Sequence, residues 1–241
     1  MMEETEMEFN LEDNWKKVLN NIEKAAEKSG RDPKEIVLVN VSKTKPSEML
    51  LEAWEGGINI FGENYAQELV EKQKFFDEKG LQPEWHFIGH LQTNKVKYLA
   101  PFVAMIHSVG SVKLAKEISK QAIKNDRIID ILLQVNTSGE MSKSGCDPDQ
   151  LLELAEEVLN IENINVRGLM TIGSFSEDEE IYRSEFRLLK KLRDRARERF
   201  GEEHFEHLSM GMTHDYEHAI EEGATIVRVG TAIFGERIYK K

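Results

Sequence analysis

Hydrophobic and polar positions along the chain follow two alternating periodicities, one typical of strands and one typical of helices. Eight short apolar runs predict β-strands at residues 35–42, 58–62, 84–88, 103–108, 128–135, 164–170, 206–210 and 225–229. Between them, apolar residues at helical spacing predict helices near residues 47–55, 64–78, 92–99, 111–124, 148–160, 178–199 and 214–222. A leading helix is predicted over residues 10–29, and a short helical turn over residues 231–234 follows the last strand.

Strict alternation of strand and helix predicts parallel strands joined by right-handed crossovers. Eight such units favour an α/β fold with a single closed (β/α)8 TIM-type barrel over an open, doubly wound sheet. No stretch rich in Pro, Ser and Gly interrupts the series. We therefore expect one barrel domain over residues 10–241, with the extra N-terminal helix at its start, and an acidic tail over residues 1–9.

The composition argues against several classes of protein. The 241 residues carry a net charge of −12, which disfavours nucleic-acid binding and adhesion to anionic membranes. No apolar run is long enough to span a bilayer, and the acidic N-terminus lacks the features of a signal peptide. With Cys146 as its single cysteine, the chain forms no internal disulfide. We expect a cytoplasmic monomer in which Cys146 is structural or incidental.

The end of the first predicted strand carries the strongest candidate for chemistry. Side chains two residues apart share a face of a strand, so Lys43 lies on the face of Val41 and Val39. A lysine at the end of an apolar face is poorly solvated, which favours the neutral amine that attacks an aldehyde. Taken alone, such a lysine more often reaches solvent, which is the role we expect for Lys45.

The carboxyl ends of the last two predicted strands resemble a phosphate site, since sites of this fold form at strand ends. Gly230 and Thr231 lead into a helical turn whose N–H groups can point at an anion, and Ser209 can add a hydroxyl. Gly230 could instead serve only as a turn residue. Arg228, on the same strand face as Gly230, needs an ion-pair partner or a ligand atom. Together with Lys43, these residues describe a pocket for a phosphorylated aldehyde.

Two further patterns suggest other chemistry. His214, Glu217 and His218 fit the H-x-x-E-H motif of inverted zinc peptidases, so a zinc hydrolase is a remote alternative. The motif starts where a helix begins, and Asp215 or Thr213 there is more simply a helix N-cap. The arginines and lysines of residues 183–199 accompany an apolar, core-facing stripe, which predicts a solvated amphipathic helix rather than a nucleic-acid surface.

Eight segments, taken in order, resemble the pyridoxal 5′-phosphate (PLP) homeostasis protein family. They are Val-Ser-Lys-Thr-Lys-Pro (41–46), Phe-Gly-Glu-Asn-Tyr (61–65), Trp-His-Phe-Ile-Gly (85–89), Leu-Gln-Thr-Asn-Lys (91–95), Ser-Lys-Ser-Gly (142–145), Arg-Gly-Leu-Met (167–170), Ser-Met-Gly-Met (209–212) and Val-Gly-Thr-Ala-Ile-Phe-Gly (229–235). The resemblance implies an alanine-racemase-like barrel that holds PLP as an aldimine of Lys43. It implies that the phosphate group is contacted by Ser209, Gly230 and Thr231, and that Arg228 is the neighbour of the ring nitrogen. It further implies that Asn64 and Met210 line the pocket.

The resemblance also implies a role in vitamin B6 homeostasis, in which PLP is buffered or delivered to PLP-dependent apoenzymes without robust catalysis. The alternative is a racemase-like enzyme, which needs an acid/base group on each face of its substrate. Tyr65 is the nearest candidate for the second group. Racemases of this kind take that group from a second domain, which we do not expect in a chain that ends at Lys241.

Four remaining positions are left open by the resemblance. Lys143 is either a second PLP contact or a solvated loop lysine. The chain departs from the usual family pattern at Asn40, His90 and His214. Asn40 is polar at a strand position whose parity points toward the helices. None of these three is an expected cofactor contact.

Overall fold

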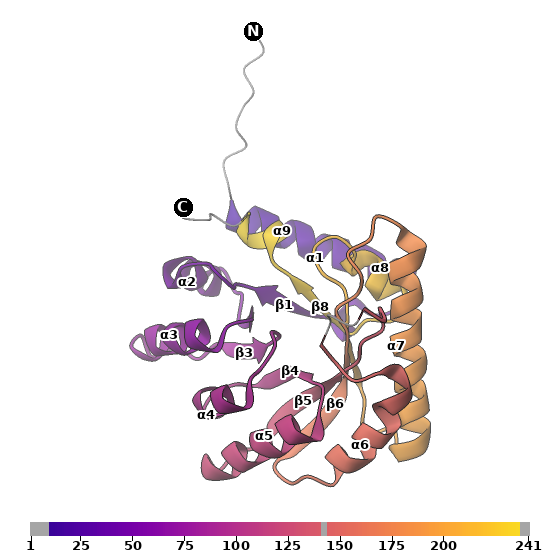
Figure 1. Cartoon of the computed structure of the whole chain (residues 1–241). Coiled ribbons are helices and arrows are strands. Elements are labelled where there is room, and N and C mark those ends of the chain that lie inside the picture. Colours follow the sequence, from indigo (N-terminus) through magenta and orange to yellow (C-terminus); the bar gives the residue numbers. More distant parts are fainter. Residues whose placement is uncertain (1–9, 141–143, 237–241) are drawn as a thin grey trace.

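The computed structural model describes residues 10–140 and 144–236, and in them eight parallel strands close into a barrel in chain order. The strands are β1 (Val37–Val41), β2 (Ile60–Glu63), β3 (Glu84–Phe87), β4 (Met105–Val109), β5 (Ile129–Gln134), β6 (Ile164–Met170), β7 (His207–Ser209) and β8 (Ile226–Val229). Each lies within two residues of its predicted bounds. The predicted barrel is therefore confirmed (Figure 1).

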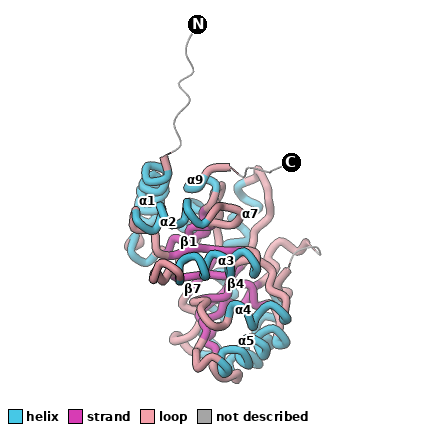
Figure 2. The backbone as a smooth tube through the Cα atoms, turned by 90° about the vertical axis from the view of Figure 1, so that its left-hand side faces the viewer, coloured by secondary structure: helices cyan, strands magenta, loops and turns pink. Residues whose placement is uncertain are grey.

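Helices surround the strands on the outside of the barrel, as Figure 2 shows. They are α1 (Leu11–Lys28), α2 (Ser47–Glu55), α3 (Ala66–Asp77), α4 (Val96–Leu99), α5 (Val112–Lys124), α6 (Leu151–Leu159), α7 (Glu179–Phe200), α8 (Tyr216–Glu221) and α9 (Thr231–Phe234). Short 3₁₀ turns occupy Pro33–Glu35, Thr93–Lys95 and Pro148–Gln150. Within the described residues, none of these helices combines the length and the apolar character needed to cross a bilayer.

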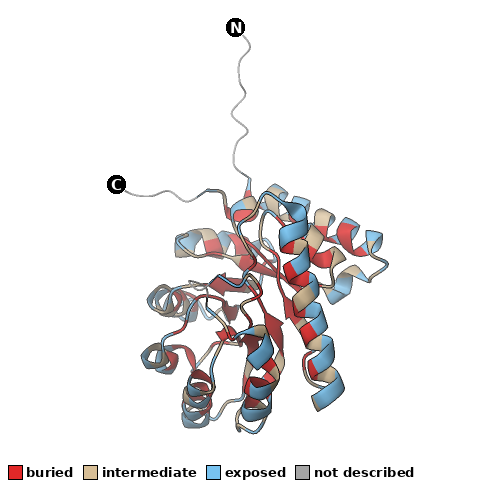
Figure 3. Ribbon diagram, turned by 45° about the vertical axis from the view of Figure 1, so that its right-hand side comes forward, coloured by how far each residue is buried: buried red, intermediate tan, exposed pale blue. Residues whose placement is uncertain are grey.

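The strand residues divide between two hydrophobic cores according to their parity. One core lies inside the barrel and consists of buried side chains at alternate strand positions: Val39, Met105, Leu132, Met170 and Ile226. The other lies between strands and helices, and its largest members include Phe61, Phe76 and Trp85, whose rings pack together. Figure 3 shows burial concentrated on the strands and on the inward faces of the helices. A period of two therefore decides which side chains enter the barrel.

The two amphipathic helices predicted at residues 10–29 and 178–199 pack an apolar face against the rest of the protein, as expected. Helix α1 covers the side of the barrel formed by α8 and α9, where Asn21 donates a hydrogen bond to the Tyr216 hydroxyl at 3.1 Å. Helix α7 buries an apolar face around Phe186 and Leu189. Several of its arginines are exposed, whereas the partly buried Arg183 pairs with carboxylates of α8 and the following turn. The predicted acidic tail, residues 1–9, lies outside the described residues.

The barrel closes where β1 pairs with β8. Val39 lies opposite Arg228 and Asn40 opposite Val229. Just beyond this pair, a Cβ atom on Gly230 would lie 3.1 Å from the Val41 carbonyl oxygen, so only glycine permits this close approach without a shift. Asn40 points out of the barrel, as its parity predicts, and its amide donates to the Ile60 carbonyl at 3.0 Å.

Candidate functional site

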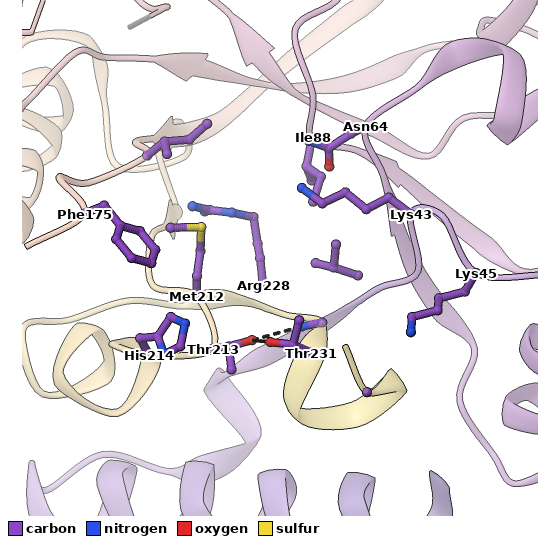
Figure 4. Close-up of a pocket in the computed structure, with 14 residues that line it drawn as sticks. Lys43, Lys45, Asn64, Ile88, Phe175, Met212, Thr213, His214, Arg228 and Thr231 are labelled. Atoms are coloured by element: carbon purple, nitrogen blue, oxygen red, sulfur yellow. Dashed lines mark hydrogen bonds between the residues drawn. The ribbon is translucent and has the colours of Figure 1, made fainter. Parts of the chain in front are cut away.

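A pocket of about 300 Å³ opens at the carboxyl ends of the strands, within the range that small-molecule sites occupy. Five of the seven predicted site residues line it: Lys43, Asn64, Arg228, Gly230 and Thr231. In Figure 4, Lys43 and Asn64 lie at the upper right, Thr231 lies below them, and Arg228 lies to their left beside Met212. Residues from opposite ends of the chain therefore meet around one cavity.

The turn that carries Lys43 rests on a buried ion pair. The ammonium group of Lys72, on α3, lies 2.6 Å from Glu63 Oε1 and donates to the Ser42 carbonyl at 2.8 Å. The Ser42 hydroxyl donates to the same Glu63 oxygen at 2.6 Å. Both charged side chains are almost fully buried. Burial raises the pKa of Glu63 to about 7, although Lys72 and the Ser42 hydroxyl oppose the shift.

A second carboxylate holds the other side of the same turn. Glu68 accepts from Lys72 at 2.7 Å and from the backbone N–H of Thr44 at 2.6 Å. Thr44 has a φ of 65°, a left-handed conformation that a β-branched residue adopts only when its surroundings impose it. Lys43 thus lies between two anchored neighbours, and its side chain follows the inner face of β1 into the pocket.

The opposite wall gathers donors suited to an anion. Thr231 opens the short helix α9, and its hydroxyl lies 3.2 Å from the hydroxyl of Thr213. The Gly230 N–H also reaches Thr213 Oγ1, at 3.3 Å. Figure 4 shows both contacts as dashed lines. Two hydroxyls and a backbone N–H at one place can bind a phosphate group.

Thr213 is the site residue that sequence reasoning missed, because the sequence suggested it only as a possible N-cap of α8. At that N-cap position the structure has Asp215, whose carboxylate accepts from the Met212 N–H at 2.5 Å. The available signal was its position, since a hydroxyl residue directly follows the Ser-Met-Gly-Met segment. Two apolar residues of the pocket rim, Ile172 and Phe175, also carried no sequence signal.

The two other predicted site residues do not line this pocket. Ser209 is fully buried inside the barrel, where its hydroxyl contacts Arg228 and His107. Met210 is fully buried in the outer core between strands and helices. Thr213, a few residues further along the same segment, lines the pocket instead. The cofactor contacts expected of Ser209 and Met210 stay untested predictions.

Arg228 is buried, and its hydrogen-bond acceptors among the described residues are uncharged. Its Nη1 donates to Ser209 Oγ at 2.7 Å and its Nη2 to the Thr171 carbonyl at 2.8 Å. Burial lowers the pKa of Arg228 to about 10, and the carboxylate of Asp215 opposes the shift. At neutral pH the guanidinium therefore stays charged, and it faces the pocket.

Asn64 offers an acceptor to a ligand. Its Oδ1 is buried and has no hydrogen-bond partner among the described residues, although the side chain lies beside Lys43 at the pocket (Figure 4). An unpaired buried amide oxygen costs free energy unless a ligand or water pairs with it. The Asn64 oxygen therefore suits a donor on a bound molecule.

The other sequence candidates lie outside the pocket or at its rim. Tyr65 is exposed at the start of α3 and does not line the pocket, whereas His214 does. His90 is exposed, with its Nδ1 3.4 Å from the Ser144 hydroxyl. Burial raises the pKa of the Cys146 thiol to about 11, as for a structural cysteine. Lys143 lies outside the described residues.

The zinc alternative gains no support. Residues 10–140 and 144–236 contain no group of three or more His, Cys, Asp or Glu side chains that could hold a metal ion. His218 Nδ1 lies 2.8 Å from the Tyr182 hydroxyl, and Glu217 accepts from Asn21 at 3.2 Å. His214 packs edge-to-face against Phe175 at the pocket rim. The three motif residues thus have separate partners.

The barrel, with a lysine after β1 and an arginine on β8, defines a class of protein. The family model described as "Alanine racemase, N-terminal domain" matches residues 14–238. The solved alanine racemase of Clostridium difficile 630 shares the fold at a TM-score of 0.73 and 15% identity, covering 95% of this chain and 59% of that one. The chain therefore has the barrel of the alanine racemase N-terminal domain, as predicted.

Within that class, the chain belongs to the pyridoxal phosphate homeostasis protein family. It is 48% identical over 223 residues to the protein of that name from Aquifex aeolicus, covering 92% of this chain and 96% of the relative. The Escherichia coli K12 protein of the same name is 40% identical, covering 95% and 97%. PipY of Synechococcus elongatus, solved with PLP bound, superimposes with a TM-score of 0.78 at 30% identity, covering 89% and 100%. The predicted family is confirmed.

Replacing Lys72 by methionine tests the support of the Lys43 turn. Without the ammonium group, Glu63 is buried without its cation, so we expect Lys72→Met to lower the free energy of unfolding by about 3–5 kcal/mol in urea titrations. Lys74→Met is the matched control, because Lys74 is exposed on the same helix, 3.9 Å from Glu78. It should change the free energy of unfolding by less than about 0.5 kcal/mol. Equal losses of unfolding free energy in both variants would contradict the role of Lys72 as the buried partner of Glu63.

The raised pKa of Glu63 predicts a pH dependence of stability. Its ordinary pKa is 4.5 and its pKa in the fold is about 7, so between these values the folded state binds the proton more tightly than the unfolded chain. The Glu63 contribution to the free energy of unfolding therefore falls as pH rises from 4.5 to about 7, and is constant above. We expect the difference in stability between the natural protein and Glu63→Gln to show this fall in urea titrations at several pH values. A difference that grows with pH would rule out the raised pKa.

Proposed function

We propose that this protein binds PLP covalently through Lys43 and takes part in vitamin B6 homeostasis, holding or delivering the cofactor rather than converting a substrate. The observation that carries the proposal is one pocket with Lys43 on one wall and the Thr213–Thr231 hydroxyls on another. Membership of the homeostasis family and the PLP bound to PipY support it. A phosphorylated aldehyde has the two groups that these walls would bind.

The residues of the pocket fit each part of PLP. The cofactor supplies an aldehyde, with which the Lys43 amine forms a carbon–nitrogen double bond as one water is lost. Thr213, Thr231 and the backbone at Gly230 would hold the phosphate group. Arg228 would donate a hydrogen bond to the ring nitrogen. Because Arg228 stays charged, the ring nitrogen stays unprotonated, which weakens PLP as an electron sink.

A weak electron sink suits storage better than catalysis. Racemisation further requires an acid/base group on the face opposite the lysine. Tyr65 is exposed and outside the pocket, so it does not supply that group in this structure. His214 lines the pocket away from Lys43 in Figure 4, and it is the residue that would serve a racemase-like alternative. That alternative requires α-hydrogen exchange of amino acids in D2O at about 1 per second or faster.

The pocket rim supports release to a partner protein. Ile172 and Phe175 are exposed at the rim, and Phe175 has 88% of its residue surface accessible to solvent. Exposed apolar side chains beside a binding site favour contact with another macromolecule. We propose that the protein works as a monomer that presents PLP at this rim to PLP-dependent apoenzymes.

Lys43→Ala tests the covalent link. We expect this variant to lose the visible absorbance band of amine-bound PLP and to lose incorporation of PLP after borohydride reduction. Lys45→Ala separates the two lysines of the turn, because the Lys45 amine is directed to the Glu236 carbonyl at 2.7 Å. At saturating PLP it should keep the band. A band that survives in Lys43→Ala but not in Lys45→Ala would contradict the proposal, because it would show that PLP is linked to Lys45.

Substitutions of Thr213 test the phosphate wall. Thr213→Val removes one hydroxyl with little change of volume, so we expect PLP to bind about tenfold more weakly in equilibrium titrations. The affinity for pyridoxal, which lacks the phosphate, should change by less than about twofold. Thr213→Ser keeps the hydroxyl and should restore PLP binding. Equal losses for PLP and pyridoxal would place the phosphate elsewhere.

A further inference from the structure

A line of buried hydrogen bonds crosses the barrel interior from the pocket toward the opposite end. It begins at Arg228 on β8, whose Nη1 lies 2.7 Å from the Ser209 hydroxyl on β7. That hydroxyl lies 2.9 Å from His107 Nδ1 on β4. His107 Nε2 lies 2.9 Å from His86 Nδ1 on β3, and His86 Nε2 lies 2.9 Å from Glu84 Oε1 at the start of the same strand. Four strands therefore contribute to one continuous path.

When both imidazoles are neutral, the two ends of this path determine the direction of every hydrogen bond in it. Arginine can only donate, and an ionised carboxylate can only accept. Glu84 accepts from His86 Nε2, so His86 Nδ1 is the acceptor for the proton on His107 Nε2. His107 Nδ1 then accepts from the Ser209 hydroxyl, whose oxygen is left to accept from Arg228. All four contacts are satisfied when both imidazoles are neutral and carry their proton on Nε2.

The electrostatic surroundings of His107 and Glu84 agree with this arrangement. His107 is fully buried, and burial is the main cause that holds its pKa well below the usual 6.5, with the charge of Arg228 acting in the same direction. Glu84 is half-exposed at the amino end of β3, and its hydrogen bond with His86 lowers its pKa. The carboxylate is thus ionised at neutral pH, and it is the fixed acceptor at the far end.

We propose that His107 and His86 are positioning residues for Arg228, acting through the Ser209 hydroxyl. Their one-way hydrogen bonds commit the Ser209 oxygen to accept from Arg228. The guanidinium is then held at two points, Ser209 Oγ and the Thr171 carbonyl, in a residue that lines the pocket. The ligand atom that would receive this fixed donor is an aromatic ring nitrogen, an identification that rests on the proposed function.

Barrel closure alone does not require this arrangement. Neighbouring inward positions carry apolar side chains, including Met105 on the same strand as His107 and Ile226 on the same strand as Arg228. Buried imidazoles cost free energy unless each nitrogen is paired, whereas apolar residues pack there without that requirement. The polar path instead leads from the half-exposed carboxylate of Glu84 to Arg228. Arg228 is the pocket residue whose orientation would determine a hydrogen bond to a ring nitrogen.

The tautomers of the two histidines test the direction of the path without any cofactor. Nitrogen NMR of ¹⁵N-histidine-labelled protein, prepared free of PLP, reports which ring nitrogen carries the proton. His86→Gln and His107→Gln variants assign the signals. We expect both rings to be neutral and protonated on Nε2 at neutral pH. A proton on Nδ1 of either ring, or a doubly protonated ring, would overturn the proposal.

A substitution at the far end tests whether the path reaches the pocket. Glu84→Leu removes the fixed acceptor, so the His107 ring should populate both tautomers. PLP should bind about fivefold to tenfold more weakly, with a shifted absorbance band. Glu206→Leu is the control, because Glu206 directly precedes β7, pairs with Arg167 at 2.7 Å and takes no part in the path. It should leave the tautomers unchanged and alter PLP affinity by less than about twofold.

The outcomes separate this proposal from the proposed function. Equal effects of Glu84→Leu and Glu206→Leu on PLP affinity and on the His107 tautomer would overturn the positioning role. If the natural protein bound no PLP at all, the proposed function would fail. The NMR comparison of the same two variants would then decide by itself whether Glu84 orients the histidines.

Discussion

The pairing of β1 with β8 is the constraint on which the site depends. It places Val39 opposite Arg228, so the inner faces of the first and last strands run into the same cavity. Lys43 continues the inner face of β1, and Gly230 continues that of β8. Beyond them, Lys45 reaches the Glu236 carbonyl, 191 residues away along the chain. A sheet that stayed open would leave these two walls on separate edges.

Buried polar groups then set the orientation of the side chains that closure has brought together. Outside the barrel wall, Lys72 and Glu63 anchor the turn that carries Lys43. Inside it, His107 and Ser209 lie behind Arg228. Such buried pairs contribute little net stability compared with apolar packing, but they permit few arrangements because each lost partner is costly. The barrel thus combines an adaptable apolar core with polar contacts that hold the site.

The secondary structure, the inward direction of Lys43 and the presence of Gly230 and Thr231 on the opposite wall were predictable, but the place of Thr213 beside them was not. Apolar residues at Val37 and Val39 mark the inner face of β1, and a period of two carries that face to Lys43. Ser209 and Thr213 are both hydroxyl residues near the end of β7. Gly211 lies between them with a φ of 90°, and the chain turns there so that Thr213, not Ser209, reaches the pocket. The sequence shows the glycine and the following hydroxyl residue, but not the direction in which the chain turns between them.

Sequence alone determined the alternating elements, the barrel, the family and the inward position of Lys43, because periodicity and short motifs are properties of neighbouring residues. Tertiary structure decided which polar groups meet: Glu63 with Lys72, His86 with His107, and Ser209 with Arg228. Two of these three pairs join residues on different strands, and the third joins β2 to α3. Their separations along the chain follow no period, since barrel closure, and not local preference, brings the partners within hydrogen-bonding distance.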